Sequence, residues 1–322
     1  MRSNLDSGSV LIRLTCVNDQ VSSVLVLSER PDVMPVLRGR TSAQAVKLVS
    51  MLFALCGQAQ ACAGTHALAA ARGTACEPYL DPSVQKEVLR EHLWRWMLDL
   101  PPLLGEAAMQ KEFVIAAQLL NKDARAELQQ LLSNPRITSM RSQLSAMNES
   151  RSSPLPLLPI LDAISSLKEW PRLDNKFSRL PEWHGAAAET GAIARYPQQA
   201  QKVGSFFSSR WLARLNELLD WCDGKDQVGA GGTVSSACVA NNIGRSLVET
   251  ARGLLMHEII LDGDRVQDYV IVAPTEWNFH PQGVLPKLIQ GTSTHDRDAL
   301  QHHVALLIAT LDPCVPWVLE WA

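Results

Sequence analysis

The segment 249–281 constrains the fold more than any other part of the chain. It contains two apolar runs on either side of Asp262-Gly263-Asp264, followed by the sequence PTEWN, which begins at Pro274. An Asp-Gly pair between apolar runs is typical of the tight turn of a β-hairpin. The second run ends in the apolar residues 270–272, directly before Pro274. We therefore expect an antiparallel hairpin that leads into the proline segment.

A second hairpin is expected near the start of the chain. Two runs of β-branched and aliphatic residues, 9–16 and 21–27, surround Asn18-Asp19. Polar residues of this kind between two apolar runs indicate a turn.

The other regular patterns are mainly helical. A helix is expected after Thr41-Ser42, which can act as its cap, and the small-residue tract 59–72 continues it. The alanines of this tract would allow close approach of another helix or of a bulky ligand. Several short helices are expected within 83–148, broken at Pro101-Pro102 and Asn134-Pro135. Further helices are expected at 206–222 and 299–311, and the range 245–255 is expected to be a helix or a tight loop.

These patterns predict an α+β, mainly helical protein with two small antiparallel hairpins. We expect one domain over residues 1–322, with a sub-boundary at the Pro- and Ser-rich stretch 149–159, the best linker candidate. Residues 229–233 are expected to form a flexible glycine loop.

Composition restricts the classes of function. The net charge is −3, so neither a nucleic acid nor an anionic membrane surface is an expected partner. No apolar run reaches the ~18–20 residues that a membrane-spanning helix needs, and the first ten residues lack the apolar core of a signal peptide. The seven scattered cysteines do not form a disulfide framework and fit a reducing compartment. We expect a cytoplasmic protein without membrane insertion.

Four pieces of the chain carry a resemblance to a known family. In order, they are LRGR at 37–40 with the cysteine-bearing helix after it, WHGAAAETGAIARY at 183–196, the segment 249–281, and DPC at 312–314. Together they resemble the large subunit of NiFe hydrogenases. The resemblance implies a shortened version of that fold. It also implies that Arg252, Pro274 and Thr275 match the residues that contact the two cyanide ligands of the active-site iron in that family.

The cysteines follow the family pattern only in part. The family has two CxxC pairs, and in each pair the first cysteine binds only nickel while the second bridges nickel and iron. Counting forward from Gly39-Arg40 puts Cys56 at the second position of the first pair. Counting back from residues 65–68 puts Cys62 there instead, and we favour Cys62 because its anchor is adjacent. At the carboxyl end Cys314 matches the nickel-only position, and Trp317 replaces the bridging cysteine.

This incomplete set resembles the HupK/HoxV-type accessory proteins of NiFe hydrogenase maturation. The resemblance implies a scaffold, not an enzyme, that transiently binds iron as Fe(CN)2CO and holds no nickel. Cys62 and Cys314 would be the iron thiolates, with Cys56 in reserve, since soft thiolates suit such an iron. The implied partners are a HypC-type chaperone with its HypD-type partner, as donor, and the immature hydrogenase large subunit, as acceptor.

Two other functions fit parts of the pattern. A metal-free chaperone could bind the apo-large subunit or the maturation chaperones through a large-subunit-like surface, and loss of the second carboxyl-terminal cysteine favours it. A catalytic hydrogenase-like enzyme is disfavoured because half of the nickel ligands are missing. For His257 and His66, a role as hydrogen-bonded core residues is expected in preference to a role as metal ligands.

Overall fold

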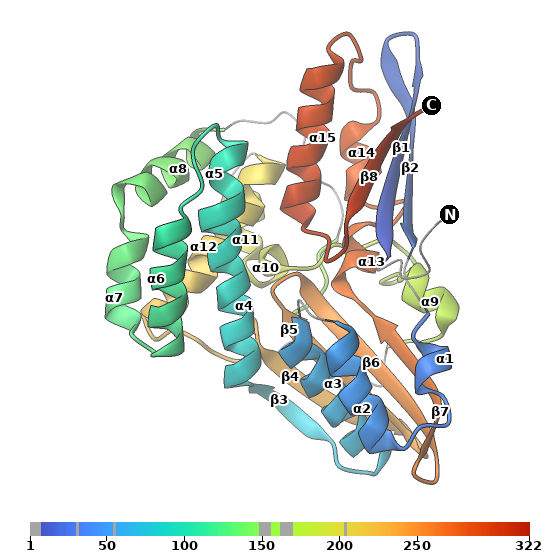
Figure 1. Cartoon of the computed structure of the whole chain (residues 1–322). Coiled ribbons are helices and arrows are strands. Elements are labelled where there is room, and N and C mark those ends of the chain that lie inside the picture. Colours follow the sequence, from blue (N-terminus) through green and yellow to red (C-terminus); the bar gives the residue numbers. More distant parts are fainter. Residues whose placement is uncertain (1–7, 30–31, 54–55, 148–155, 162–169, 203–204) are drawn as a thin grey trace.

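The computed structural model describes residues 8–29, 32–53, 56–147, 156–161, 170–202 and 205–322 of the chain. Three layers are visible in Figure 1: a helical region on one side, a five-stranded sheet covered by two helices, and a three-stranded sheet packed against the last long helix. The α+β fold expected from the sequence is thus confirmed, with more strand than the two hairpins alone would give.

The five-stranded sheet is antiparallel throughout. Its strands, in spatial order, are β3 (Cys76–Leu80), β4 (Thr233–Ala240), β5 (Ile243–Thr250), β6 (Gly253–Asp262) and β7 (Arg265–Val272). The turn at Gly263 joins β6 to β7, which confirms the expected hairpin before Pro274. The helix or tight loop expected over 245–255 is wrong, because this range belongs to β5, a short turn and the start of β6.

Two helices cover one face of this sheet, α2 (Ser42–Leu52) and α3 (Gly57–Ala71) (Figure 1). Thr41 caps α2 as expected, in a reciprocal capping box with Gln44. A Cβ atom on Gly244 would lie 2.0 Å from the carbonyl oxygen of Ala67 and 2.2 Å from the backbone nitrogen of Ala71. The small residues therefore let a helix lie directly on a strand, whereas the sequence suggested a helix partner or a ligand.

The helical region surrounds one long helix, α12 (Phe206–Cys222), at the range expected. Around it pack α4 (Pro82–Trp94), a π-helical turn (Arg95–Asp99), α5 (Leu100–Leu103), α6 (Gln110–Asn121), α7 (Arg125–Leu132) and α8 (Pro135–Ala146). The break expected at Pro101-Pro102 is wrong. Helical structure runs on from Pro82 to Leu103, because a π-turn precedes the prolines and they occupy the first turn of α5. The break at Asn134-Pro135 is confirmed, with Asn134 as the cap of α8.

The three-stranded sheet joins the two ends of the chain. Strand β1 (Ser9–Val17) pairs antiparallel with β2 (Gln20–Glu29), as expected, and parallel with β8 (Trp317–Trp321). Helices α14 (Val284–Ile289) and α15 (Arg297–Leu311) contribute to the same apolar core. Between α15 and β8 the chain passes through Asp312, which has a left-handed backbone with φ of 55°.

Short helices connect these layers: α1 (Met34–Leu37), α9 (Asn175–Arg179), α10 (Ala192–Arg195), α11 (Pro197–Lys202) and α13 (Pro274–Asn278). Most of the linker candidate 149–159 lies outside the described residues. Its last part is tied to the core, since Leu158 and Glu189 are joined by a backbone hydrogen bond of 2.9 Å. The single-domain organisation stays a prediction.

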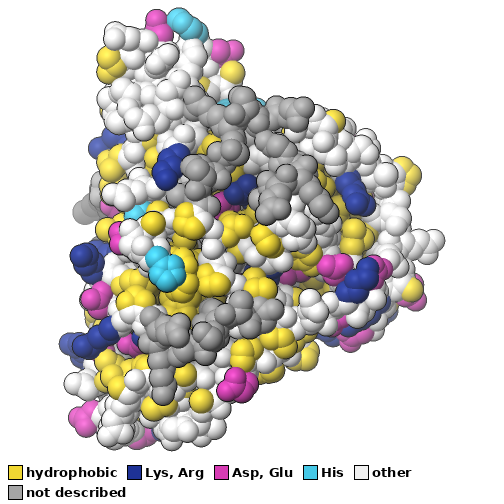
Figure 2. Space-filling view, turned by 180° about the vertical axis from the view of Figure 1, so that it is seen from behind, with side chains coloured by type: hydrophobic (Ala, Val, Ile, Leu, Met, Phe, Trp, Pro, Cys, Tyr) yellow, Lys and Arg dark blue, Asp and Glu magenta, His cyan; other side chains and the backbone are white. Residues whose placement is uncertain are grey.

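Two surface properties bear on partners. None of the described helices combines the length and apolarity that a bilayer crossing demands. In Figure 2, which shows the face opposite to Figure 1, hydrophobic side chains lie across the centre while acidic and basic ones are interspersed. Among the described residues drawn there, no broad basic patch of the kind that binds nucleic acid is visible.

Candidate functional site

The motif residues from four distant parts of the sequence meet near the ends of the five-stranded sheet. Thr275, at the start of α13, has its Oγ1 atom 3.3 Å from Sγ of Cys314 and accepts the backbone N–H of Cys314 at 3.4 Å. Arg252, in the turn between β5 and β6, has Nε 3.4 Å from Oδ1 of Asp312. The fold thus brings the proline segment, the Arg-Gly turn and the Asp-Pro-Cys motif together.

Cys56 belongs to the same group. It is the residue immediately before α3, and Nε2 of Gln60, one turn further along, lies 3.7 Å from its Sγ. Burial is the main cause that raises the pKa of Cys56 to about 12, and the charge of a Cys314 thiolate adds to it. The hydrogen bond from Gln60 and the charge of Arg252 act in the opposite direction. Cys56 is therefore a neutral thiol at neutral pH, with Cys314 and Arg252 close enough to affect its ionisation.

Arg252 is held by two carboxylates, and two of its nitrogen atoms, Nε and Nη1, make no hydrogen bond with any described residue. Its side chain is 5% exposed, and Nη2 donates to Glu91 at 3.0 Å. Burial acts to lower its pKa, but the charges of Asp312, Glu91, Cys314 and Cys56 outweigh it and raise the pKa, so the guanidinium stays charged. Nε is fully buried and makes no hydrogen bond with any described residue. Nη1 also makes no hydrogen bond with any described residue, and it is not fully buried. This N–H group can donate to an incoming acceptor.

Asp312 is a second anchor of the site. It is buried and lies between arginines, with Oδ1 2.7 Å from Nη2 of Arg95. Burial would raise the pKa of Asp312, but the charges of Arg252, Arg95 and Arg214 outweigh burial and lower the pKa. Sequence reasoning missed Arg95 and Arg214. The available signal was an arginine on the apolar face of the helical pattern 206–222, where a charge needs a partner.

The motif at 183–196 stabilises the turn that contains Arg252 through hydrogen bonds of Thr190. The Asn278 side chain donates to the carbonyl of Arg252 at 3.2 Å and accepts the N–H of Thr190 at 3.0 Å. The hydroxyl of Thr190 accepts the N–H of Leu254 at 2.9 Å. A Cβ atom on Gly253 would lie 2.3 Å from the Thr190 side chain, so the turn requires glycine there.

Cys62, which the sequence resemblance favoured as the metal ligand, contacts Asp81 and not Cys314 or Arg252. Its Sγ lies 3.9 Å from Oδ2 of Asp81, and burial followed by the charge of Asp81 raises its pKa to about 12. Of the two cysteines that the sequence left open, Cys56 is the one whose ionisation is coupled to Cys314 and Arg252. Which of them binds a metal stays a prediction.

The two histidines differ in setting. His257 is buried and its ring nitrogens lie 2.8 Å from the Tyr269 hydroxyl and 2.9 Å from Oε1 of Gln60. Burial lowers its pKa to about 3, so it is neutral. The interpretation of His257 as a hydrogen-bonded core residue is confirmed, and it orients the same Gln60 that contacts Cys56. His66 lies near the surface, beside Tyr79 and Cys76.

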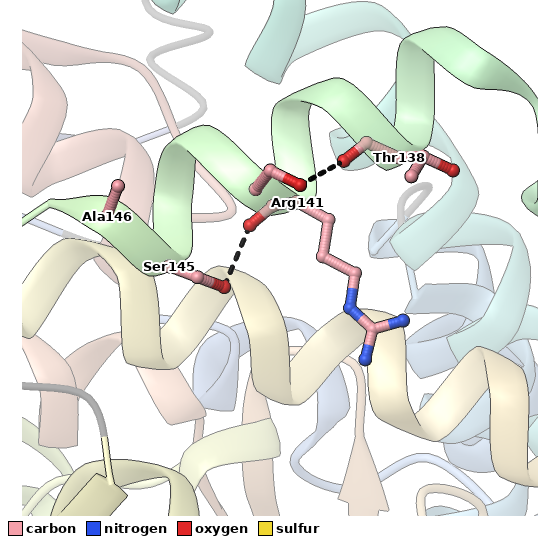
Figure 3. A pocket seen from close by; sticks show the side chains of 5 residues that line it. Thr138, Arg141, Ser145 and Ala146 are labelled. Atoms are coloured by element: carbon pink, nitrogen blue, oxygen red, sulfur yellow. Dashed lines mark hydrogen bonds between the residues drawn. The ribbon is translucent and has the colours of Figure 1, made fainter.

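One small cavity borders the site. Behind Arg252 lies a cavity of about 10 Å³, lined in part by Arg214, Thr190 and Asn278, which suits a single water molecule. A larger depression of about 520 Å³ lies on α8, next to Arg141 and Ser145, and shares no residue with the site (Figure 3). Within the described part of the chain, no group of three or more His, Cys, Asp or Glu side chains is arranged to hold a metal ion.

Comparison with known proteins gives a consistent result. No family model matches the chain. The chain is 30% identical to the hydrogenase expression/formation protein HoxV of Cupriavidus necator, over 96% of this chain and 95% of that protein. It is 28% identical to the hydrogenase expression/formation protein HupK of Bradyrhizobium diazoefficiens, over 91% and 90%, and 27% identical to HupK of Rhizobium leguminosarum, over 97% and 96%.

Solved structures with a similar fold are hydrogenases. The Ni-Fe-Se hydrogenase of Desulfovibrio vulgaris Hildenborough in its reduced state aligns with a TM-score of 0.61 at 13% identity, over 93% of this chain and 94% of that chain. The Ni-Fe-Se hydrogenase of Desulfomicrobium baculatum aligns with a TM-score of 0.60 at 12% identity, over 94% and 95%. At such low identity the similarity establishes the hydrogenase large-subunit-like fold alone.

Proposed function

Because this chain belongs to the family of HoxV and HupK hydrogenase expression/formation proteins, we propose that it is a maturation scaffold for the Fe(CN)2CO unit. It would bind this unit transiently and pass it to the immature large subunit. The observation that carries the proposal is the convergence of two thiols, Cys56 and Cys314, on an arginine whose Nη1 makes no hydrogen bond with any described residue.

The thiols supply the metal ligands in this proposal. Low-spin iron with carbonyl and cyanide ligands is soft, and thiolate sulfur is a suitable partner. Cys56 is a neutral thiol in the absence of iron, so binding must release its proton. Two thiolates hold the cargo less firmly than four, which favours its release. Cys62 takes no part, because its contacts are with Asp81.

Arg252 and Thr275 orient the cargo. A cyanide nitrogen on iron is a strong acceptor, and a charged guanidinium is a strong donor. Nη1 of Arg252 is available, while Glu91 and Asp312 fix the rest of the group. The Thr275 hydroxyl is buried against Cys314 and can donate to a second cyanide, with the Pro274 backbone beside it.

The remaining parts of the proposal follow from the family. The donor would be a HypC-type chaperone with its HypD-type partner, and the acceptor the immature large subunit, all in the cytoplasm. The protein would carry iron without nickel, and it would release its cargo unchanged, so it is not an enzyme. The second candidate is a metal-free chaperone of the apo-large subunit, which is favoured by the high pKa of Cys56, since a neutral buried thiol is a poor ligand.

Infrared spectroscopy with iron and nickel analysis separates the two candidates. The protein would be purified without oxygen from its own host during hydrogenase maturation. Iron without nickel, together with cyanide and carbonyl bands, supports the scaffold. A spectrum without these bands, from cells that are maturing hydrogenase, favours the metal-free chaperone.

Variants then assign the ligands. Cys56→Ser and Cys314→Ser should each lose most of the iron, whereas Cys62→Ser, the matched control on the same helix as Gln60, should keep it. Arg252→Lys should keep part of the iron but shift the cyanide bands, because a lysine cannot reproduce the directed N–H group. Loss of iron in Cys62→Ser with retention in Cys56→Ser would contradict the ligand assignment.

A further inference from the structure

A second group of reactive side chains lies apart from the proposed iron site. It consists of Cys62 and His66 on α3, Cys76 and Tyr79 on β3, and Asp81 directly before α4. Their contacts are mostly with one another. All five are partly exposed, and β3 is an edge strand of its sheet. None of them makes a contact with Cys56, Cys314 or Arg252 that would assign it to the iron site.

The hydrogen bonds in this group form a chain in which each donor and acceptor can be assigned. Sγ of Cys76 lies 3.4 Å from Nδ1 of His66, and Nε2 of His66 lies 2.8 Å from the Tyr79 hydroxyl. That hydroxyl donates to Oδ2 of Asp81 at 3.5 Å. Because a carboxylate can only accept, Tyr79 accepts from Nε2–H, and Nδ1 of His66 is left as the acceptor that faces the thiol of Cys76. This is the arrangement of a nucleophile, a base, and a group that orients the base.

Three further features support the same interpretation. The Ser236 hydroxyl donates to Sγ of Cys76 at 3.2 Å, which stabilises negative charge on sulfur. The pairing of β3 with β4 is irregular between Cys76 and Tyr79, and such bulges re-aim side chains at functional positions. Burial lowers the pKa of His66, which favours the neutral ring whose Nδ1 can accept a hydrogen bond from the Cys76 thiol.

We infer that Cys76 is an activated thiol, with His66 as its base, that exchanges with small uncharged disulfides. In this step the Cys76 sulfur attacks one sulfur of the disulfide and forms a new S–S bond, while the old S–S bond breaks. The thiol proton passes to Nδ1 of His66 and then to the departing thiolate, which leaves as a free thiol. One thiol and one disulfide are consumed and one of each is formed, so no other oxidant is required.

The test measures the reaction rate of each cysteine in the whole protein. The protein is treated with 2-hydroxyethyl disulfide at pH 7 without oxygen, and the modified peptides are quantified by mass spectrometry. Cys238 is the internal reference, because it is also partly exposed and contacts only a backbone carbonyl, that of Ala240 at 3.2 Å. Cys76 should react at least about fivefold faster than Cys238, because His66 can take up the thiol proton as the sulfur attacks.

Two variants decide whether the base is responsible. His66→Gln should bring the rate of Cys76 down to that of Cys238, and Tyr79→Phe, which disconnects Asp81, should lower it in part. A wild-type Cys76 no faster than Cys238 would overturn the inference, as would an unchanged Cys76 rate in folded His66→Gln. If His66→Gln does not fold, an unchanged rate in Tyr79→Phe would overturn it instead. Neither variant touches Cys56 or Cys314, so iron retention is a separate readout.

Discussion

At the scale of single residues, the Cys56 thiol lies among groups that act on its charge in opposite directions. Burial and a nearby Cys314 thiolate disfavour ionisation, and the Gln60 amide and Arg252 favour it. The net effect is a Cys56 thiol that stays protonated until a metal ion displaces its proton. This property suits transient binding, because a returning proton competes with the metal.

The raised pKa predicts how the iron-free protein responds to alkaline pH. An unfolded cysteine ionises with a pKa near 9.0, and the folded Cys56 ionises near 12. Between these values the unfolded state has lost the proton and the folded state has kept it, so stability is full below about pH 9 and falls as the pH rises. The slope from one such group is at most about 1.4 kcal/mol per pH unit.

Urea unfolding at pH 8, 9 and 10 checks this prediction. Cys56→Ser should lose part of the decrease in unfolding free energy that the wild type shows between pH 9 and 10. Cys238→Ser is the control and should keep the wild-type slope. Equal slopes for Cys56→Ser and the wild type would show that Cys56 is not held as a buried thiol.

At the scale of elements, the contact between α3 and β5 depends on one residue. The backbone of α3 approaches Gly244 so closely that any side chain there would overlap Ala67 and Ala71. Gly244→Ala should therefore destabilise the protein by about 1–3 kcal/mol through overpacking. Thermal unfolding measures the loss. Gly57→Ala is the matched control, because its new Cβ would lie at an ordinary 3.5 Å from Ser50, and it should unfold within about 0.5 kcal/mol of the wild type.

The elements also show what the sequence could predict. The hairpin turns at Asn18-Asp19 and Gly263, the cap at Thr41 and the break at Asn134-Pro135 could be predicted, because each depends on a local pattern. Strand β5 was not, because every residue after Ile243 is buried and no apolar–polar alternation marks it as a strand. The π-turn before Pro101 packs around α12, and no local sequence pattern predicts it.

At the scale of the whole molecule, distance in the sequence limited the prediction of the site. Arg252, Thr275 and Cys314 could be proposed together because their motifs occur in a familiar order. Counting could not show which of Cys56 and Cys62 lies near Cys314 and Arg252, because that depends on where α3 begins, and α3 begins directly after Cys56. Arg95 and Asp312 meet only once α15 packs beside the helical region.

A buried ion network joins the helical region to the five-stranded sheet. Arg195 donates to both oxygens of Glu217 on α12, at 2.7 and 2.8 Å, and to Glu249 on β5 at 3.0 Å. Its side chain is 1% exposed. His92 on α4 lies 2.7 Å from Glu217. The network therefore spans four elements, α4, α10, α12 and β5, so loss of stability in one region should lower the stability of the other.

This network provides a test of the single-domain prediction. Arg195→Met removes the buried ion pairs of Arg195 with Glu217 and Glu249 and should cost about 3–5 kcal/mol. Arg13→Met is the control, because Arg13 and Glu320 are each 44% exposed and such pairs contribute about 1 kcal/mol or less. Unfolding in urea would be followed by tryptophan fluorescence and by circular dichroism. If residues 1–322 form one domain, the two probes should give coincident transitions in the wild type and in both variants. Separate transitions, with only one of them shifted by Arg195→Met, would instead divide the helical region from the sheet, because a true single domain transmits the lost ion pair to every probe.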